Sequence, residues 1–360
     1  MNLSEFDYEL PQERIAQFPH RNRDDSRLLV VDRKSGKVED RFFHEIVNYL
    51  RAGDVLVLND SRVINARLIG EKKGTGAKIE LFLLKPRKKD YVSGEKDVWE
   101  CLARPAKRLK PGDMVLFGEN GEEISSFTLI EMTARVIRRL DTGGMLVKFK
   151  HEGEFSDVLD RLGRVPLPPY IKRTPDSSDT VRYQTVYAKV PGSAAAPTAG
   201  LHFTSRLLDE IRDMGVETVF VTLHVGLGTF LPVKEERIED HQMHTEAYHI
   251  SRKAARIINN AKKTGGRIFC VGTTSVRTLE SASVGGKVVA GNGRTDIFLY
   301  PGGPPFRMTD ALVTNFHLPK STLLMLVSAF YDREKVLDVY RDAVKKAYRF
   351  FSYGDAMLIL

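Results

Sequence analysis

The sequence is poor in cysteine and tryptophan and has no long apolar run. Its 360 residues include only 2 Cys and 1 Trp. Cys101 and Cys270 lie far apart and outside any Cys-x-x-Cys pattern, which argues against a disulfide framework or a cysteine metal site and predicts that both are buried. No segment reaches the roughly 18 uninterrupted apolar residues of a membrane span, and the first residues predict no targeting signal. We therefore expect a cytoplasmic protein with no membrane partner.

Charge of one sign is in modest excess. Lys and Arg number 55 against 47 Asp and Glu, which gives a net charge of +8 and a pI near 9.3. Such a balance suits a polyanionic partner such as RNA, although solubility alone explains it equally well. A hydrophobic content of 42% is sufficient for substantial cores.

The distribution of apolar segments and turn residues along the sequence predicts two domains. Short alternating apolar segments separated by turn residues fill residues 70–164, which predicts a small inserted antiparallel β-barrel. The flanks, 1–69 and 165–360, are predicted to form one discontinuous α/β catalytic domain, mixed and with a barrel-like core sheet. The expected elements of its second part are a helix capped by Thr204 or Ser205 and ended by Gly215, a strand at 217–225, a helix at 252–263, a strand at 267–272, a helix at 275–282, a strand at 311–318 and a buried helix at 321–330.

The stretch VPGSAAAPTAGLHFT, residues 190–204, has almost no core-forming side chains. It leads directly into His202 and a capped helix of the same α/β core, whereas a linker is followed by a new domain. Small residues let a ligand approach the backbone closely. We therefore predict that Gly192 to Gly200 form a pocket wall with His202 at its rim.

Two further stretches have the form of ligand-binding loops. GLGTFL at 226–231 lacks the third glycine of a dinucleotide fingerprint and is followed by Pro232, so a Rossmann cofactor site is rejected. In GTTSVRTLES a strand ends at Thr273 and Thr274 and opens a helix, which predicts an anion site, with ordinary capping by Thr274 as the alternative.

Histidines are concentrated in one region. Five of the nine fall between His202 and His249, with acids among them, which raises a metal hypothesis, but no His-Glu-x-x-His pattern is present and we expect no metal. As a strand, DHQMHTEAYHI places His244, Glu246 and Tyr248 on one face, where they line a pocket without metal. The strand at 217–225 has His224 at the end of its polar face, either at a pocket or as a half-buried structural histidine.

Polar and basic residues stand out in the first half of the chain. GDVLVLNDSRVINARL runs a hydrophobic strand into Asn59, Asp60, Ser61 and Arg62, with Arg67 five residues on. Polar residues at the end of a strand commonly lie at a site, with a turn and a surface salt bridge as the alternative. The basic runs KPRKK (85–89) and KRLK (107–110) are typical of solvated turns.

Several of these stretches together closely resemble one family, the S-adenosylmethionine:tRNA ribosyltransferase-isomerases of queuosine biosynthesis. The most specific are AAPTAGLHF and TNFHLPKSTLLMLVSAF, and the others span nearly the whole chain outside the insertion. They are FDYELPQERIAQFP, DDSRLLV, GDVLVLNDSRVINARL, PLPPYIKR, RYQTVYAKVPGS, HVGLGTFLPV, DHQMHTEAYHI, VGTTSVRTLES, TDIFLYPG and YRFFSYGDAMLI. Positions that depart from the pattern expected for the family are Asn65, Val190, Leu227, Leu231 and Ala247.

The resemblance implies an activity. The family transfers and isomerises the ribosyl part of S-adenosylmethionine onto 7-aminomethyl-7-deazaguanine at the wobble position of tRNA, which gives epoxyqueuosine-tRNA, adenine and methionine. S-adenosylmethionine is then a co-substrate, with no prosthetic group, and the partner is the anticodon stem-loop of a tRNA. A monomer is expected.

The chemistry implied by the resemblance needs a base for the proton next to the sulfonium and an acid near the adenine ring. The expected catalytic residues are His202, His224, His241 and Glu246. We expect Asn59, Asp60 and Arg62 at the deazaguanine, Thr198 and Gly200 at the donor, and Thr273, Thr274 and Arg277 at the methionine carboxylate; Arg67, Asn315 and His317 complete the expected substrate-binding set. The alternatives are a metal-dependent hydrolase built on the histidine cluster and an RNA-binding module without catalysis.

Overall fold

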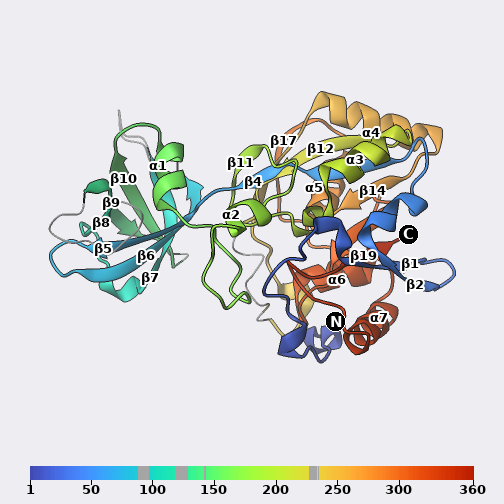
Figure 1. Ribbon diagram of the computed structural model, residues 1–360, viewed down its shortest axis with the longest axis horizontal. Coiled ribbons are helices and arrows are strands. Elements are labelled where there is room, and N and C mark those ends of the chain that lie inside the picture. The colour runs from blue at the N-terminus through green and yellow to red at the C-terminus, as the bar shows by residue number, and fades with distance from the viewer. Residues whose placement is uncertain (88–96, 119–128, 142, 227–232, 234) are drawn as a thin grey trace. The chain divides into compact units, whose positions relative to one another are not determined.

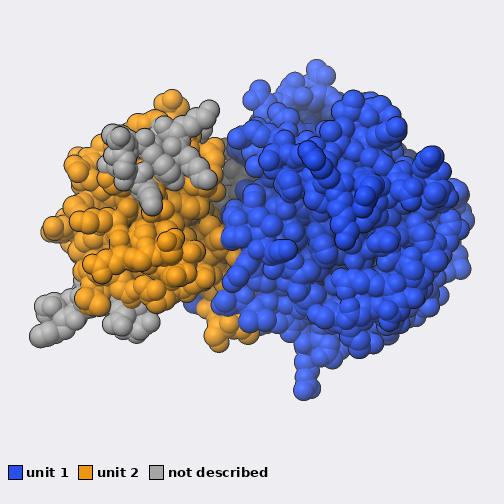
Figure 2. Space-filling model, turned by 90° about the horizontal axis from the view of Figure 1, so that it is seen from above, with its two compact units in different colours: residues 1–62, 168–174, 180–360 blue, residues 63–167, 175–179 orange. Residues whose placement is uncertain are grey.

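The computed structural model describes residues 1–87, 97–118, 129–141, 143–226, 233 and 235–360. Two compact units divide the chain, one of residues 1–62, 168–174 and 180–360 and the other of residues 63–167 and 175–179 (Figure 2). The smaller unit thus begins before residue 70, because the strand β5 (Arg67–Lys72) pairs with the strands of the insertion. The sequence pattern did not separate this strand from the polar stretch that precedes it.

The larger unit is built on a nine-stranded sheet (Figure 1). Across the sheet the strands are β17 (Gly291–Thr295), β13 (Glu246–Ile250), β12 (Glu217–Leu223), β3 (Val55–Asn59), β14 (Ile268–Val271), β18 (Ala311–Asn315), β19 (Ala356–Ile359), β1 (Arg27–Val31) and β2 (Val38–Phe42). Pairing is parallel from β12 through β3 and β14 to β18, and between β19 and β1; the other neighbours are antiparallel. Hydrogen bonding in the described part of this sheet ends at β17 and β2, so the barrel-like sheet that we expected is not closed by a ladder.

Both faces of this sheet are covered, because alternate residues of a strand point to opposite faces and both sets are apolar. Val55 and Val57 of β3 join a core with the helices α4 (Arg252–Thr264), α5 (Thr273–Ser281), α6 (Thr322–Phe330) and α7 (Arg333–Lys345). Leu56 and Leu58 join the opposite core with α3 (Ser205–Asp213) and the 3₁₀ helix Phe43–Tyr49. The result is a three-layered α/β unit (Figure 1).

Local signals set the ends of most helices. Thr204 caps α3 by accepting a hydrogen bond from the peptide N–H of Leu207 at 3.1 Å, and α4 ends at Gly265 with φ +80°. α5 starts two residues earlier than a cap at Thr274 requires: it begins at Thr273 with Gly272 as its cap, so the alternative in which Thr274 caps the helix is wrong. The strand containing Glu246 also starts later than expected, which leaves His244 outside the strand and exposed.

The smaller unit is a closed antiparallel barrel. Its strand order is β10 (Met145–His151), β7 (Val98–Arg104), β6 (Ala77–Pro86), β5, β8 (Met114–Gly118) and β9 (Ile130–Arg139). Inward-facing apolar side chains fill it, and the helix α1 (Phe155–Leu162) packs its buried face on the same core. The remaining elements are β4 (Ser61–Val63), β11 (Val190–Ser193), β15 (Ser283–Val284), β16 (Lys287–Val288), α2 (Asp179–Arg182) and the 3₁₀ helices Leu3–Phe6, Gln12–Arg14, Arg23–Asp25, Ala106–Arg108, Thr198–His202 and Ile238–Asp240.

The predicted fold class, a mixed α/β unit with an inserted antiparallel β-barrel, is confirmed. Cys101 and Cys270 are free and buried, as expected from the sequence. Among the described helices, none is long and apolar enough to cross a membrane.

Candidate active site

The candidate site lies where four parallel strands end. Because β12, β3, β14 and β18 run in the same direction, their carboxyl ends meet at one edge of the sheet, the usual position of ligand sites in α/β folds. The residues at these ends are Asn59, His224, Gly272 and Asn315, which close or directly follow the four strands.

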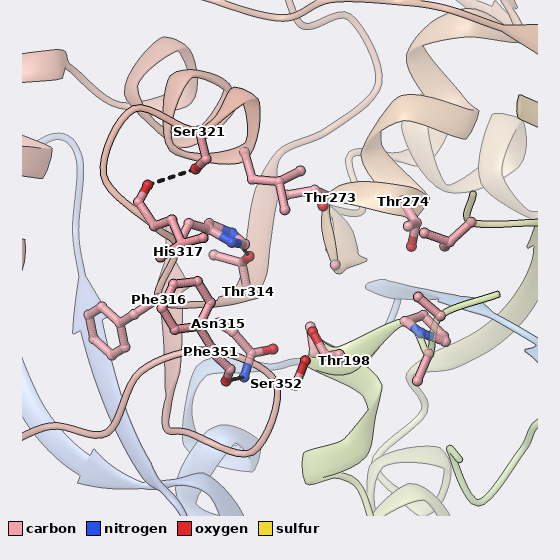
Figure 3. A pocket seen from close by; sticks show the side chains of 18 of the residues that line it. Thr198, Thr273, Thr274, Thr314, Asn315, Phe316, His317, Ser321, Phe351 and Ser352 are labelled. Carbon is pink, nitrogen blue, oxygen red and sulfur yellow. Dashed lines mark hydrogen bonds between the residues drawn. The ribbon is translucent and has the colours of Figure 1, made fainter. Parts of the chain in front are cut away.

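A cavity of about 350 Å³ opens at this edge, within the size range of small-molecule sites (Figure 3). Its wall includes residues 195–199, which are the middle part of the run from Gly192 to Gly200 that was predicted to form a pocket wall. The run is held by hydrogen bonds: the peptide N–H of Ala194 donates to the Val225 carbonyl at 3.0 Å, and the peptide N–H of Val225 donates to Ser193 Oγ at 3.0 Å. It is therefore an ordered wall and not a linker.

Five of the expected substrate-binding residues line this cavity, namely Thr198, Thr273, Thr274, Asn315 and His317 (Figure 3). The sequence reasoning did not single out Tyr170, Phe351 and Ser352, which line it as well. The rings of Tyr170 and Phe351 stack with their centres 4.5 Å apart. Phe351 and Ser352 lie in YRFFSYGDAMLI, one of the stretches that carry the family resemblance. No local pattern distinguishes these two residues within it.

His317 presents a neutral ring to the cavity. Its Nε2 lies 2.8 Å from Thr314 Oγ1, its peptide N–H donates to the Tyr340 hydroxyl at 3.3 Å, and its carbonyl accepts from the Tyr8 hydroxyl. Burial lowers the pKa of His317 to about 3, so the ring carries no charge at neutral pH.

His202 lies behind the cavity wall. Its ring stacks on Phe43, Nδ1 lies 2.7 Å from Ser26 Oγ, and Nε2 lies 3.0 Å from Asn315 Nδ2. Burial lowers the pKa of His202 to about 4, against an opposing effect of the Asp355 charge. It lines a second cavity of only about 20 Å³ with Ser26, so the structure places it beside Asn315 and not on the wall of the larger cavity.

His224 follows β12 and lies against a glycine. A Cβ on Gly192, which has φ +134°, would lie 3.1 Å from His224 Cε1, so only glycine lets the backbone approach the ring this closely. No described residue hydrogen-bonds to His224 Nδ1, which is buried. Burial lowers the pKa of His224 although the Asp60 charge raises it, and Asp60 Oδ1 accepts from the Thr222 hydroxyl at 2.6 Å.

Glu246 and Arg277 form a buried ion pair. Arg277 Nη1 donates to Glu246 Oε2 at 2.5 Å, and Glu246 Oε1 accepts from the Gly226 peptide N–H at 2.8 Å. The two side chains are only 6% and 4% exposed. Arg277 Nε and Nη2 are buried and find no acceptor in the described part of the chain. The pair thus leaves two charged N–H groups available one turn after Thr273.

The remaining expected residues lie apart from the cavity. Asn59 bonds the backbone on both sides of its amide, since Oδ1 accepts from the N–H of Ser61 and Leu223 and Nδ2 donates to the Leu223 carbonyl. Gly200 packs behind the wall, where a Cβ would lie 2.0 Å from the Tyr187 hydroxyl.

Three side chains that we expected at substrate have other surroundings. Arg62 is exposed in β4. Arg67 lies in the barrel unit and bonds Glu80 through Nε and Nη2 at 2.9 and 3.2 Å. His241 Nδ1 lies 2.8 Å from Glu235 Oε2.

Within the described residues, no group of three or more His, Cys, Asp or Glu side chains is placed to hold a metal ion. GLGTFL lies outside the described residues except for Gly226, and so do Leu227 and Leu231.

The cavity is mostly apolar, lies at the carboxyl ends of the parallel strands and has buried neutral histidines beside it. This is the arrangement of an α/β enzyme that acts on a small organic substrate. A family profile described as "Queuosine biosynthesis protein" matches residues 3–359. The chain belongs to this family.

Relatives of known name are similar over their whole length. The S-adenosylmethionine:tRNA ribosyltransferase-isomerase of Caldanaerobacter subterraneus subsp. tengcongensis is 52% identical over 361 residues, and that of Staphylococcus haemolyticus is 53% identical over 361 residues. Each alignment covers 100% of both chains. The crystal structure of S-adenosylmethionine tRNA ribosyltransferase from Thermotoga maritima is 37% identical, covers 99% of this chain and 100% of its own, and superposes with a TM-score of 0.54.

Proposed function

We propose that the chain is an S-adenosylmethionine:tRNA ribosyltransferase-isomerase. It transfers and isomerises the ribosyl part of S-adenosylmethionine onto 7-aminomethyl-7-deazaguanine at the tRNA wobble position, and epoxyqueuosine-tRNA, adenine and methionine are the products. The observation that carries this proposal is the identity of about half of all residues with named relatives along the entire chain. S-adenosylmethionine is consumed as a co-substrate, and no prosthetic group is needed.

The cavity suits part of the sulfonium donor. Its hydroxyl groups at Thr198, Thr273 and Thr274 can bond the ribosyl oxygens, and its alanine wall allows close approach. Arg277 offers two charged N–H groups that have no acceptor among the described residues and suit the methionine carboxylate, and Glu246 holds the guanidinium in place. We therefore assign Glu246 to positioning Arg277 in this reaction.

Among the expected acid and base residues, His224 has the surroundings of a base. A general base must be unprotonated before it acts, and burial lowers the pKa of His224, so its ring is neutral at pH 7. Its Nδ1 has no partner among the described residues and is free to accept a proton from the donor carbon next to sulfur. The role of His241 stays a prediction.

The second substrate is a tRNA, and the net charge of +8 favours binding to a polyanion. We propose that Asp60 and the exposed Arg62 contribute to recognition of the deazaguanine and its backbone, with Asn59 holding the loop that carries them and Arg67 as a further RNA contact. Action as a monomer stays a prediction. Its tRNA substrate makes the cytoplasm the expected location.

Adenine release tests the proposal. The protein is incubated with S-adenosylmethionine and a tRNA that carries the deazaguanine, and adenine is quantified by chromatography. We expect adenine in proportion to modified tRNA, and none with the same tRNA lacking the modified base. A folded protein that binds tRNA but releases no adenine would be an RNA-binding module instead. Loss of the activity with a chelator, together with stoichiometric metal in the protein, would favour the metal-dependent hydrolase.

A variant tests the proposed base. We expect His224→Ala to lower kcat by about 10²- to 10⁴-fold, the usual contribution of a general base. His249→Ala is the matched control, because His249 is exposed and its side chain bonds only Asn292 among the described residues. Near-normal turnover in folded His224→Ala protein would remove His224 from the mechanism.

A further inference from the structure

Asn315 carries an unused hydrogen-bond acceptor into the cavity. Its side chain is only 2% exposed, it lines the cavity, and no described residue donates to its Oδ1. In Figure 3 the amide nitrogen of Asn315 faces the Phe351 carbonyl, while the oxygen faces the opposite way, toward Thr198. A buried carbonyl oxygen without a donor costs stability, which is a reason to look for a ligand that supplies the N–H.

The orientation of this amide is set by three acceptors. Asn315 Nδ2 donates to His202 Nε2 at 3.0 Å and to the carbonyl of Phe351 at 3.0 Å, and lies 3.4 Å from the carbonyl of Asp355. A rotated amide would place its oxygen against two carbonyl oxygens, which repel it. Oδ1 is therefore fixed on the cavity side.

The same contacts determine the form of the His202 ring. Because Nε2 accepts from Asn315, the ring proton is on Nδ1, which donates to Ser26 Oγ at 2.7 Å; the Ser26 hydroxyl in turn donates to the Arg23 carbonyl at 3.3 Å. Burial, which lowers the pKa of His202 to about 4, keeps this neutral form throughout the physiological range. Both ring nitrogens of His202 are thus occupied, Nε2 by Asn315 and Nδ1 by Ser26.

The surroundings of Oδ1 select the kind of ligand. Among the described residues that line the cavity there is no Asp, Glu, Lys or Arg, and the one histidine is neutral. An ammonium or carboxylate group would lack a counter-charge there, so the cavity favours a neutral group. The aromatic rings of Tyr170 and Phe351 and the wall at Ala195–Ala199 favour a flat, mainly apolar one.

We propose that Asn315 Oδ1 accepts a hydrogen bond from the 6-amino group of the donor's adenine, and that His202 is the positioning residue that fixes this acceptor. The inference rests on the proposed function, because only an adenine-containing donor brings this group. Of the parts of S-adenosylmethionine, adenine alone is both flat and neutral and carries an N–H donor on its edge. His202 then acts through Asn315 and exchanges no proton with substrate.

The test compares two donors on the full chain with modified tRNA at saturation. One is S-adenosylmethionine, and the other is its analogue with purine in place of adenine, which lacks only the 6-amino group. The kcat and KM for release of the free base are measured with both. An unpaired buried acceptor lowers affinity by about 10- to 100-fold, so we expect kcat/KM to favour the natural donor by at least that factor, mainly through KM.

Variants separate recognition from the different leaving ability of the two bases. The preference is the ratio of kcat/KM for S-adenosylmethionine to kcat/KM for the purine analogue. Dividing the wild-type preference by that of Asn315→Ala cancels the intrinsic difference in leaving ability between adenine and purine. We expect this quotient to be about 10 or more. His202→Phe keeps a ring on Phe43 but removes the acceptor for Asn315 Nδ2, and should lose the preference similarly; His202→Gln restores an acceptor and should recover most of it. His249→Phe, the matched surface change, should leave the preference intact.

The outcomes are distinct. Release of neither base by folded wild-type protein overturns the proposed function and this inference with it. Base release with equal preference in wild type and Asn315→Ala overturns the inference alone. If Asn315→Ala does not fold, the His202 pair decides: a fall in turnover that is equal for the two donors in His202→Phe would show a merely structural role and refute the positioning assignment.

Discussion

Burial of a neutral histidine beside Asn315 should make the larger unit sensitive to acid, and replacing His202 by Phe should remove a defined part of that sensitivity. The pKa of His202 falls from 6.5 to about 4 on folding because the ring is buried. Above pH 6.5 the ring is neutral in both states. Between pH 6.5 and about 4 the unfolded chain binds a proton that the folded chain does not, so the free energy of unfolding decreases as the pH falls.

The size of the effect follows from the shift. Each pH unit within the window costs about 1.4 kcal/mol, which amounts to about 2 kcal/mol between pH 7 and pH 5 for His202. His317, with a pKa near 3, contributes about the same over that interval. His202→Phe should therefore lose about half of the acid sensitivity that the two histidines confer. Its lost hydrogen bonds lower stability by an amount that does not depend on pH.

Urea unfolding at pH 7 and pH 5 measures this. The near-ultraviolet circular dichroism of tyrosine reports the larger unit, because all but one of the 12 tyrosines lie outside residues 63–167. Fluorescence of the single tryptophan, Trp99, reports the barrel and serves as an internal control, since neither histidine belongs to that unit. An unchanged difference between pH 7 and pH 5 in His202→Phe would mean that His202 titrates normally in the folded state, and the reasoning on its neutral form would be wrong.

Three further predictions concern the buried pair, the wall and the RNA contact. Glu246→Gln should lower the free energy of unfolding by about 3 kcal/mol because it leaves Arg277 charged and buried. The double variant with Arg277→Met should recover at least half of this loss. Urea unfolding of the wild type, the single variant and the double variant measures both effects, and a cost of Glu246→Gln under about 1 kcal/mol contradicts the prediction. Gly200→Ala should cost about 1–3 kcal/mol because its methyl group meets a buried tyrosine hydroxyl. Gly226→Ala, whose Cβ meets no atom of the described residues closer than 3.9 Å, should change stability by less than about 0.5 kcal/mol, and equal effects of the two changes on melting temperature would refute the close packing. Arg62→Ala should reduce the slope of log Kd for tRNA against log salt by about one unit, and an unchanged slope would make Arg62 structural.

Local structure was predictable where it depends on near neighbours in the chain. Ser251 and Gly265 bound α4 as a cap and a left-handed stop, and the predicted helix at 252–263 differs from α4 by one residue at its end. The strand β12, which ends at Leu223 just before His224, and the helix that opens at Ser205 are equally local. Local reasoning was less reliable where one sequence pattern fits two structures. Thr274 has the side chain of a helix cap but lies inside α5, because Gly272 makes the turn and occupies the cap position.

The polar contacts of the site could not be predicted in this way. Asn315 and His202 are 113 positions apart, and Glu246 and Arg277 are 31 apart, so no periodicity relates them. Phe351, whose carbonyl accepts from Asn315, has φ +70°, a conformation that its residue type disfavours and that only the surrounding packing maintains.

By itself the sequence determined the class of fold, the family, the small-residue wall at Ala195–Ala199 and the set of polar side chains at strand ends, because each depends on short-range pattern or on residue type alone. Only the tertiary structure decided which of those side chains meet. The strand order places the ends of β18 and β14 beside the wall, and burial then converts His202 from an expected acid or base into a neutral acceptor for Asn315. Protonation and hydrogen bonding depend on the local dielectric and on neighbours brought together by folding, and neither is encoded at any single position.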